Sequence, residues 1–294
     1  MSAPETERRS AALADLDLRP TIDAVRAVVR GHRDVLAAVE AAEPAIAALA
    51  DAAAARMDAG GRVVYVGAGS AGRIGRLDAS EWGPTFSIPD GAVTALLAGA
   101  EHPAGSAAEA AAEDDAGAGA DAVRALEPTR DDVVIAVSAS GSTRFGLGAL
   151  EAAAGAFTAA VVCVSDSAMA RRVDLAVEVP VGAEVISGST RLKAGTAQKL
   201  VLNAFSTAVM VRRGRTLGDL MTSMRVANAK LRERAARICI AATGCSDDAA
   251  RAALAGAEDD IALAVVMLTR GLDASAGRAL LGAAGGNVRR AVSG

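Results

Sequence analysis

Four hydroxyl side chains stand within six residues of this sequence, around a single glycine. They are Ser138, Ser140, Ser142 and Thr143. The loop follows the apolar segment 132–137 and precedes a predicted helix, where free backbone N–H groups and the helix dipole favour an anion such as phosphate. The alternative is ordinary capping of that helix by one hydroxyl. Because capping needs one such residue and this loop has four, we favour phosphate binding.

A second loop with binding chemistry is the segment 67–73, which reads Gly-Ala-Gly-Ser-Ala-Gly-Arg and matches G-x-G-x-x-G after an apolar run. Gly69 and Ser70 are its candidate binding residues. A dinucleotide site also requires an acid about 20 residues further on, and Glu101 comes later than that. The glycines can equally serve a strand that turns tightly into a helix, so the motif alone leaves both interpretations open.

Carboxylates are the remaining candidates for acid/base chemistry. Glu81 follows the helix predicted after the glycine loop, Glu113 ends an alanine-rich helix, and Glu184 follows the last predicted strand. Their spacing alone does not distinguish any of them from a solvated surface acid.

Short apolar segments that alternate with helical ones must position these loops. The segments that predict strands are 62–66, 93–97, 132–137, 159–164 and 175–179. The segments that predict helices are 21–57, 106–126, the stretch from the hydroxyl loop to about 154, 190–213 and 219–240. This alternation predicts an α/β fold with a mostly parallel sheet covered on both faces. Ligands of such sheets bind beyond the carboxyl ends of the strands, where both loops fall.

The 294 residues exceed the size of one typical domain. We expect a helical segment at 1–58 that packs on the core, an α/β domain at 59–240, and a small helical bundle at 241–294. The bundle is predicted because the last segment has short apolar runs punctuated by glycine and no strand pattern.

Composition excludes several classes of function. The net charge is −4 and aromatic residues make up 2%, which argues against nucleic-acid binding through bulk positive charge or base stacking. The two histidines and three cysteines have no zinc-ligand spacing. No uncharged stretch is long enough to span a bilayer, and the polar, acidic start predicts no secretory signal. We expect a cytoplasmic protein without a membrane or nucleic-acid partner.

Together these loops resemble the sugar-isomerase (SIS) domain, and longer stretches narrow the resemblance. The segments 6–9, 67–81 and 182–203 resemble the N-acetylmuramic acid 6-phosphate etherases, and the run Gly-Ser-Thr-Arg-Leu-Lys-Ala-Gly-Thr-Ala-Gln-Lys is the most specific part. The similarity extends to the Gly-Gly-Asn at 285–287 and so covers nearly the whole chain. It implies a three-layer SIS-type fold with a C-terminal helical bundle.

The resemblance also implies an activity. That family cleaves the D-lactyl ether of N-acetylmuramic acid 6-phosphate without a metal or other cofactor, giving N-acetylglucosamine 6-phosphate and D-lactate. The family motifs place the two catalytic glutamates on Glu81, as proton donor to the ether oxygen, and on Glu113, as its acid/base partner. They add further candidate binding residues for the sugar phosphate, namely Glu184, Ser187, Ser189 and Lys193.

Three departures from the family pattern bear on substrate preference. Ser70-Ala71 replaces the usual Thr-Ser, Trp82-Gly83 replaces Cys-Pro, and one extra residue precedes Glu113. One extra residue in a helix turns a side chain by about 100°. The family motif therefore matches this sequence less closely at Glu113 than at Glu81.

Two rival functions use the same fold. A sugar-phosphate-binding regulator similar to the glucokinase regulatory protein would keep the phosphate loops but not need the glutamates, and that protein carries two SIS domains. A sugar-phosphate isomerase would use a different acid/base pair. For any of these functions we expect a homodimer, as the resemblance also implies. Its predicted interface contains apolar positions of the long helices, namely Leu200, Val201, Val209 and Met210.

Overall fold

The computed structural model describes residues 5–293 and divides by its contacts into two compact units. The first contains the residues up to Ser80 together with Gly91–Ser206, and the second contains Glu81–Asp90 together with the residues from Thr207 on. The boundaries at residues 58 and 240, which separate the N-terminal helical segment, the α/β domain and the C-terminal bundle, stay a prediction.

The first unit is built on a five-stranded parallel sheet. Its strands are β1 (Val63–Gly67), β2 (Val93–Leu97), β3 (Val133–Ser138), β4 (Phe157–Val162) and β5 (Leu175–Glu178). They lie in the order β2-β1-β3-β4-β5. The register pairs Gly67 with Leu97 and Val137, so β1 and β2 end level with each other and β3 extends one residue further. The predicted parallel sheet is confirmed.

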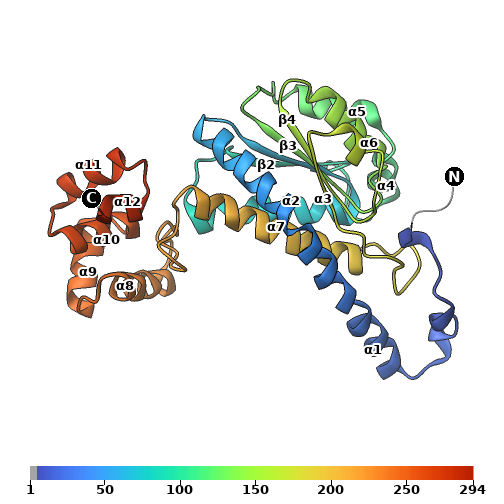
Figure 1. Cartoon of the computed structure of the whole chain (residues 1–294), viewed down its shortest axis with the longest axis horizontal. Helices are drawn as coiled ribbons and strands as arrows, with labels where there is room; N and C mark the ends of the chain where they lie inside the picture. The colour runs from blue at the N-terminus through green and yellow to red at the C-terminus, as the bar shows by residue number, and fades with distance from the viewer. Residues whose placement is uncertain (1–4, 294) are drawn as a thin grey trace. The chain divides into compact units, whose positions relative to one another are not determined.

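Helices cover both faces of this sheet (Figure 1). Those that begin in the first unit are α1 (Thr21–Gly31), α2 (Arg33–Asp58), α3 (Gly69–Phe86), α4 (Ala107–Ala112), α5 (Ala116–Arg124), α6 (Arg144–Ala152) and α7 (Lys193–Arg212). Short 3-10 turns occur at Glu5–Glu7, Ala11–Leu13, Leu16–Leu18 and Ala170–Arg172. Val64 and Val66 pack with α5 and α6 in one buried cluster. Tyr65 points to the opposite face, where its ring meets Phe205 of α7 edge-on at 6.4 Å between centroids.

The single helix expected over 106–126 is two helices. The side chain of Ser106 accepts a bond from the backbone of Glu109 at the start of α4, and Asp115 accepts one from Ala118 at the start of α5. A second N-cap inside the alanine-rich stretch restarts the helix there. Glu113 therefore stands at the C-terminal end of α4 and not in a helix interior.

The helix expected over 219–240 begins ten residues later. It is α8 (Ala229–Thr243), whose first turn is capped by the side chain of Asn228. Gly214 and Gly218, which lie between α7 and the expected start, have φ of +71° and +62°, so α7 does not continue through this stretch.

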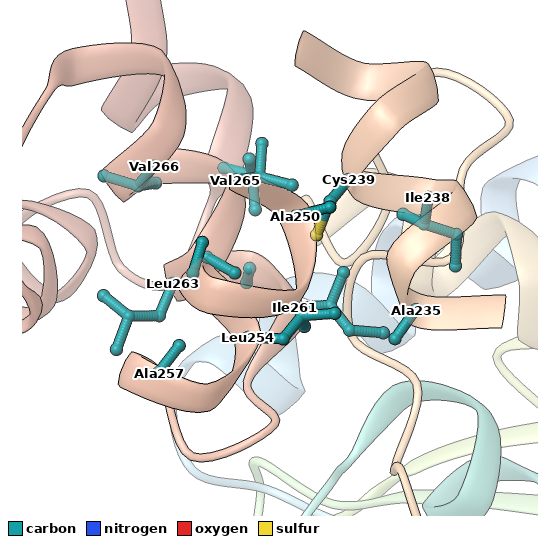
Figure 2. Close-up of a cluster of buried hydrophobic side chains, with 14 of the residues drawn as sticks. Ala235, Ile238, Cys239, Ala250, Leu254, Ala257, Ile261, Leu263, Val265 and Val266 are labelled. Atoms are coloured by element: carbon teal, nitrogen blue, oxygen red, sulfur yellow. The ribbon is translucent and has the colours of Figure 1, made fainter. Parts of the chain in front are cut away.

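The second unit is a helical bundle, as expected, and it includes α8. Its other helices are α9 (Asp247–Gly256), α10 (Ile261–Arg270), α11 (Ala274–Ala283) and α12 (Val288–Ser293). Small aliphatic side chains form its core, with Cys239, Ala250 and Ile261 in the cluster that Figure 2 shows. Aspartate or serine N-caps and the left-handed Gly244 and Gly271 delimit these helices, as the glycine punctuation predicts. Within residues 5–293, no helix is long and apolar enough to cross a membrane.

Candidate functional site

The glycine loop is a tight strand-to-helix turn at the end of β1. A Cβ atom on Gly67 would lie 2.8 Å from the Cα of Gly72, and Gly69 has a φ of +51°. Close packing of strand and helix accounts for these glycines whether or not a ligand binds. Ser70 lies half-buried in the first turn of α3.

The hydroxyl loop at the end of β3 is held by its own side chains. The Oγ of Ser138 lies 2.9 Å from Oγ1 of Thr143 and accepts the N–H of Gly141 at 3.0 Å. The hydroxyls of Ser140 and Ser142 lie 2.8 Å apart. Ser138 is buried, whereas Ser142 is exposed. Ser138 and Thr143 thus shape the loop, while Ser140 and Ser142 are the hydroxyls nearer to solvent.

The geometry at the start of α6 bears on the capping alternative. Thr143 occupies the N-cap position, but its hydroxyl makes no cap bond to the helix. The hydroxyls of the loop bond to one another instead, which is not what ordinary capping requires. Gly141 has a φ of +63°, and a Cβ there would lie 2.3 Å from Oγ of Ser167. This position therefore requires glycine.

Glu113 lies against this loop. Its carbonyl oxygen accepts the N–H of Phe145 at 3.0 Å, and its Oε1 is 3.4 Å from the Thr143 hydroxyl. The Glu113 residue is exposed. The structure thus brings one of the two proposed catalytic carboxylates to the edge of the predicted phosphate loop.

Glu81 is an exposed residue of α3 and belongs to the second unit. One turn earlier on the same helix, Asp78 is buried and accepts the hydroxyl protons of Tyr65, at 2.7 Å, and Ser206, at 3.0 Å. Asp78 therefore fixes α3 to β1 and α7. Asp78 lies within the segment 67–81, which carries the family resemblance, but its function could not be predicted from the sequence because its two partners lie 13 and 128 residues away.

Glu184 is buried at the start of α7. Its two carboxylate oxygens accept the backbone N–H groups of Lys193 and Ala194, each at 2.9 Å. The ammonium group of Lys193 donates to the carbonyl of Ala183 at 3.2 Å. Glu184 therefore satisfies the first free N–H groups of α7, a stabilising position for a carboxylate.

Cys163, after β4, connects the hydroxyl loop to the segment before α7. Its N–H donates to Ala139 at 3.1 Å, its carbonyl accepts from Val181, and its thiol donates to the carbonyl of Ala194 at 3.6 Å. Burial, together with the charge of Glu184, raises the pKa of the Cys163 thiol to about 12. The thiol therefore stays protonated at neutral pH, and its contribution is structural.

Ser187 and Gly188 hold the N-terminal segment. The hydroxyl of Ser187 donates to the carbonyl of Glu7 at 2.6 Å, and the N–H of Gly188 donates to the carbonyl of Thr6 at 3.1 Å. Thr6 is buried. Two stretches that carry the family resemblance, far apart in sequence, are therefore neighbours in space. Ser189 lies half-buried in the same turn.

The apolar positions expected at a dimer interface are mostly buried in the single chain. Val201, Val209 and Met210 are fully buried, and Leu200 is half-buried. They are therefore not surplus surface, because packing within the chain already covers them. In the described part of the chain, most of the exposed large apolar side chains lie near the N-terminus, at Leu18, Ile22, Val25, Val29 and Leu36, and the others are Leu77, Ile186 and Val211.

Within residues 5–293 no group of three or more His, Cys, Asp or Glu side chains is arranged to hold a metal ion.

Comparisons with known proteins agree with the resemblance. The model of the glucokinase regulatory protein N-terminal SIS domain matches residues 45–154. N-acetylmuramic acid 6-phosphate etherase of Cutibacterium acnes is 47% identical over 98% of this chain and 95% of that protein. The protein of the same name from Streptomyces coelicolor is 44% identical over 98% of this chain and 93% of its own length.

A phosphoheptose isomerase from Francisella tularensis has a similar structure, with a TM-score of 0.52 and 21% identity over 65% of this chain and 98% of that one. This likeness shows the fold, which is the SIS-type α/β arrangement. The curated relatives are 44–47% identical to this chain over 98% of its length, which shows more than the fold. The chain therefore belongs to the N-acetylmuramic acid 6-phosphate etherase family.

Proposed function

We propose that this chain is a lyase that cleaves the D-lactyl ether of N-acetylmuramic acid 6-phosphate, releasing D-lactate and N-acetylglucosamine 6-phosphate. The observation that carries the proposal is the placement of Glu113 beside the hydroxyl loop, with Oε1 3.4 Å from Thr143. An etherase needs a carboxylate within reach of C2 and C3 of the sugar whose phosphate is bound. A module that only binds sugar phosphates does not.

The phosphate is assigned to the hydroxyl loop and the start of α6. Ser140 and Ser142 present hydroxyls there, and the N-terminal turn of α6 adds N–H groups and the positive end of its dipole. Gly69 and Ser70, at the N-terminal turn of α3, are assigned to the same sugar phosphate. Ser138 and Thr143 contribute by keeping the loop in shape.

Glu184, Lys193, Ser187 and Ser189 were expected to contact the substrate. The contacts of the first three favour an indirect contribution, because Glu184 caps α7, Lys193 bonds to Ala183, and Ser187 holds the N-terminal segment. We assign these three to holding the segments around the site, whereas Ser189 stays a candidate for substrate contact.

The reaction is assigned to two carboxylates acting in turn. In the open-chain sugar the C1 aldehyde acidifies the proton on C2, and a base removes it. The electron pair left on C2 forms a C2–C3 double bond as the C3–O bond breaks, and an acid protonates the departing lactyl oxygen. Water then adds its hydroxyl to C3 and a proton to C2. We assign protonation of the lactyl oxygen to Glu81 and proton transfer at C2 to Glu113.

A homodimer in the cytoplasm is the proposed state of the protein. The exposed apolar residues of α1, among them Ile22, Val25 and Val29, support burial against a second copy. The cytoplasm is proposed because a charged sugar phosphate does not cross a membrane unaided.

The deciding experiment is incubation with N-acetylmuramic acid 6-phosphate and enzymatic assay of D-lactate. Release of D-lactate from the phosphorylated sugar, and very little from the unphosphorylated one, is the expected result. A binding regulator would release none while still showing affinity for the sugar phosphate. An isomerase would convert aldose and ketose phosphates without lactate, so both rivals are measured in parallel.

A further inference from the structure

Arg73 and Glu109 form an ion pair between two helices of the first unit. An Nη2–H group of Arg73 donates to both carboxylate oxygens of Glu109, at 2.6 and 2.5 Å. The Glu109 side chain is only 6% exposed, whereas that of Arg73 is 42% exposed. The pair joins the second turn of α3 to the first turn of α4.

Helix α4 has only six residues. A helix of this length is not stable by itself, so its position is set by what it contacts. At its first turn the Glu109 carboxylate also accepts the N–H of Gly105. Gly99 approaches so closely that a Cβ there would lie 2.8 Å from the Cα of Glu109. Glu109 therefore holds the N-terminal end of α4 in place.

Glu113 follows Glu109 by four residues, about one helical turn, and stands at the end of α4. Its carbonyl is bonded to Phe145 and its carboxylate lies beside Thr143. The short helix is thus fixed at one end by Arg73 and joined at the other to the hydroxyl loop. Any movement of α4 would carry the Glu113 carboxylate with it.

We propose that Arg73 is a positioning residue, which acts through Glu109 to place the Glu113 carboxylate beside the phosphate loop. The expected effect of Arg73 on the reaction rests on the proposed function. The competing interpretation is that Arg73, the last residue of the glycine loop, binds the substrate phosphate itself. Its donation to both oxygens of a buried carboxylate favours the first interpretation, because removal of the arginine would leave that carboxylate without its counter-charge.

The test compares Arg73→Met with the matched control Arg76→Met, an exposed arginine one turn further along α3. We expect Arg73→Met to lower kcat by about 10²-fold, because a small displacement of a catalytic group has that effect, with little change in KM. We expect Arg76→Met to change neither. Arg73→Lys keeps the charge without the two-oxygen contact and should give an intermediate kcat.

A second substitution distinguishes positioning from phosphate binding. Arg73→Met with Glu109→Leu removes both partners and leaves no unpaired buried charge, so we expect kcat to recover roughly tenfold over Arg73→Met alone. A phosphate-binding arginine predicts a raised KM in Arg73→Met and no recovery in the double variant. Either of those results would overturn the proposal.

Hydrogen–deuterium exchange provides a readout that does not need activity. Exchange in the peptide covering 107–113 should rise in Arg73→Met, fall back in the double variant and stay unchanged in Arg76→Met. Unchanged exchange in Arg73→Met would refute the anchoring itself. If exchange behaves as expected but the wild-type chain releases no D-lactate, the proposed function fails while the anchoring of α4 stands.

Discussion

Phe145 donates its backbone N–H to the carbonyl oxygen of Glu113 at 3.0 Å, which ties the end of α4 to the first turn of α6. This bond uses one of the free N–H groups in the first turn of α6. The other free N–H groups of that turn lie next to the hydroxyl loop. A proposed acid/base residue and a proposed phosphate site are therefore built on one piece of backbone.

The phosphate assignment predicts that Ser140→Ala raises KM. A hydrogen bond to a charged group contributes about 1.5–3 kcal/mol, so we expect an increase of about tenfold or more with kcat less affected. Steady-state kinetics with N-acetylmuramic acid 6-phosphate measures it. Ser275→Ala, which removes an exposed hydroxyl in the second unit, is the control, and an unchanged KM in Ser140→Ala would contradict the assignment.

The N-terminal segment is predicted to depend on Ser187. Its hydroxyl donates to the carbonyl oxygen of Glu7 at 2.6 Å, and a hydrogen bond of this kind contributes about 0.5–1.5 kcal/mol. We therefore expect Ser187→Ala to loosen the segment and to speed tryptic cleavage after Arg8 and Arg9. Ser189→Ala is the matched control, because this half-buried serine lies in the same turn. Equal cleavage rates in the two variants would show that the Ser187 hydroxyl is not what holds the segment.

Asp132 is predicted to make the free energy of unfolding depend on acid pH. Burial opposes ionisation, but hydrogen bonds from the Arg62 side chain and from the N–H groups of Thr129 and Arg62 outweigh it and lower the pKa of Asp132 to about 2. Because the folded-state pKa lies below the unfolded value, this stabilisation is present above about pH 4 and is lost as the pH falls toward 2. The shift corresponds to about 2 kcal/mol.

Urea unfolding of the wild-type chain and of Asp132→Asn between pH 6 and about 2.5 measures this contribution. The stability difference between the two chains should shrink as the pH falls. Asp131→Asn, at the half-buried neighbouring position, should run parallel to the wild type. A difference independent of pH would mean that Asp132 stabilises the fold through packing and not through its charge.

Thiol reactivity is predicted to differ among the three cysteines. Burial, together with the charge of Glu184, raises the pKa of Cys163 to about 12. Burial beside Cys245 raises that of Cys239, in the core shown in Figure 2, to about 11. Cys245 is half-buried and should react first with a disulfide reagent at pH 8, because only the thiolate attacks. Cys245→Ser should remove the fast phase, and a fast phase that persists would place a reactive thiolate elsewhere.

The sequence predicted the elements that depend on local pattern. The strands β1 to β5 follow from continuous apolar runs, since a parallel sheet buried on both faces requires them. The break between α4 and α5 was not predicted, because the alanine-rich sequence favours one continuous helix. In such a helix Asp115 would be an ordinary surface residue and not an N-cap.

The missed parts of the site depend on pairs distant in sequence. Arg73 and Glu109 are 36 residues apart, and no pattern in either segment predicts that the two side chains form a pair. For Glu184 the sequence predicted substrate binding, which stays a prediction. It did not predict that this carboxylate also accepts two backbone N–H groups at the start of α7, because those donors lie nine and ten residues further along the chain. Tertiary packing decides which polar residues are used for structure and which are left for a ligand.

The proposed roles of the two glutamates lead to the most discriminating prediction. Glu81→Gln keeps the shape and polarity of the side chain but cannot deliver a proton to the departing lactyl oxygen. Glu81 is exposed on α3, so the fold should survive the change. General acid catalysis contributes about 10²–10⁴-fold, and D-lactate release should fall by at least the lower figure.

Exchange of the C2 proton with solvent deuterium separates the two roles. Removal of that proton precedes departure of lactate, so Glu81→Gln should still exchange it, whereas Glu113→Gln should lose exchange and lactate release together. Asp114→Asn, an exposed neighbour of Glu113, is the control and should change neither rate. Both rates are followed in one D₂O reaction, by NMR for C2 and by D-lactate assay for cleavage. If folded Glu81→Gln releases lactate at the wild-type rate, the acid is another residue. Exchange that survives in Glu113→Gln would remove Glu113 from C2 and leave the loop beside it as a binding site only.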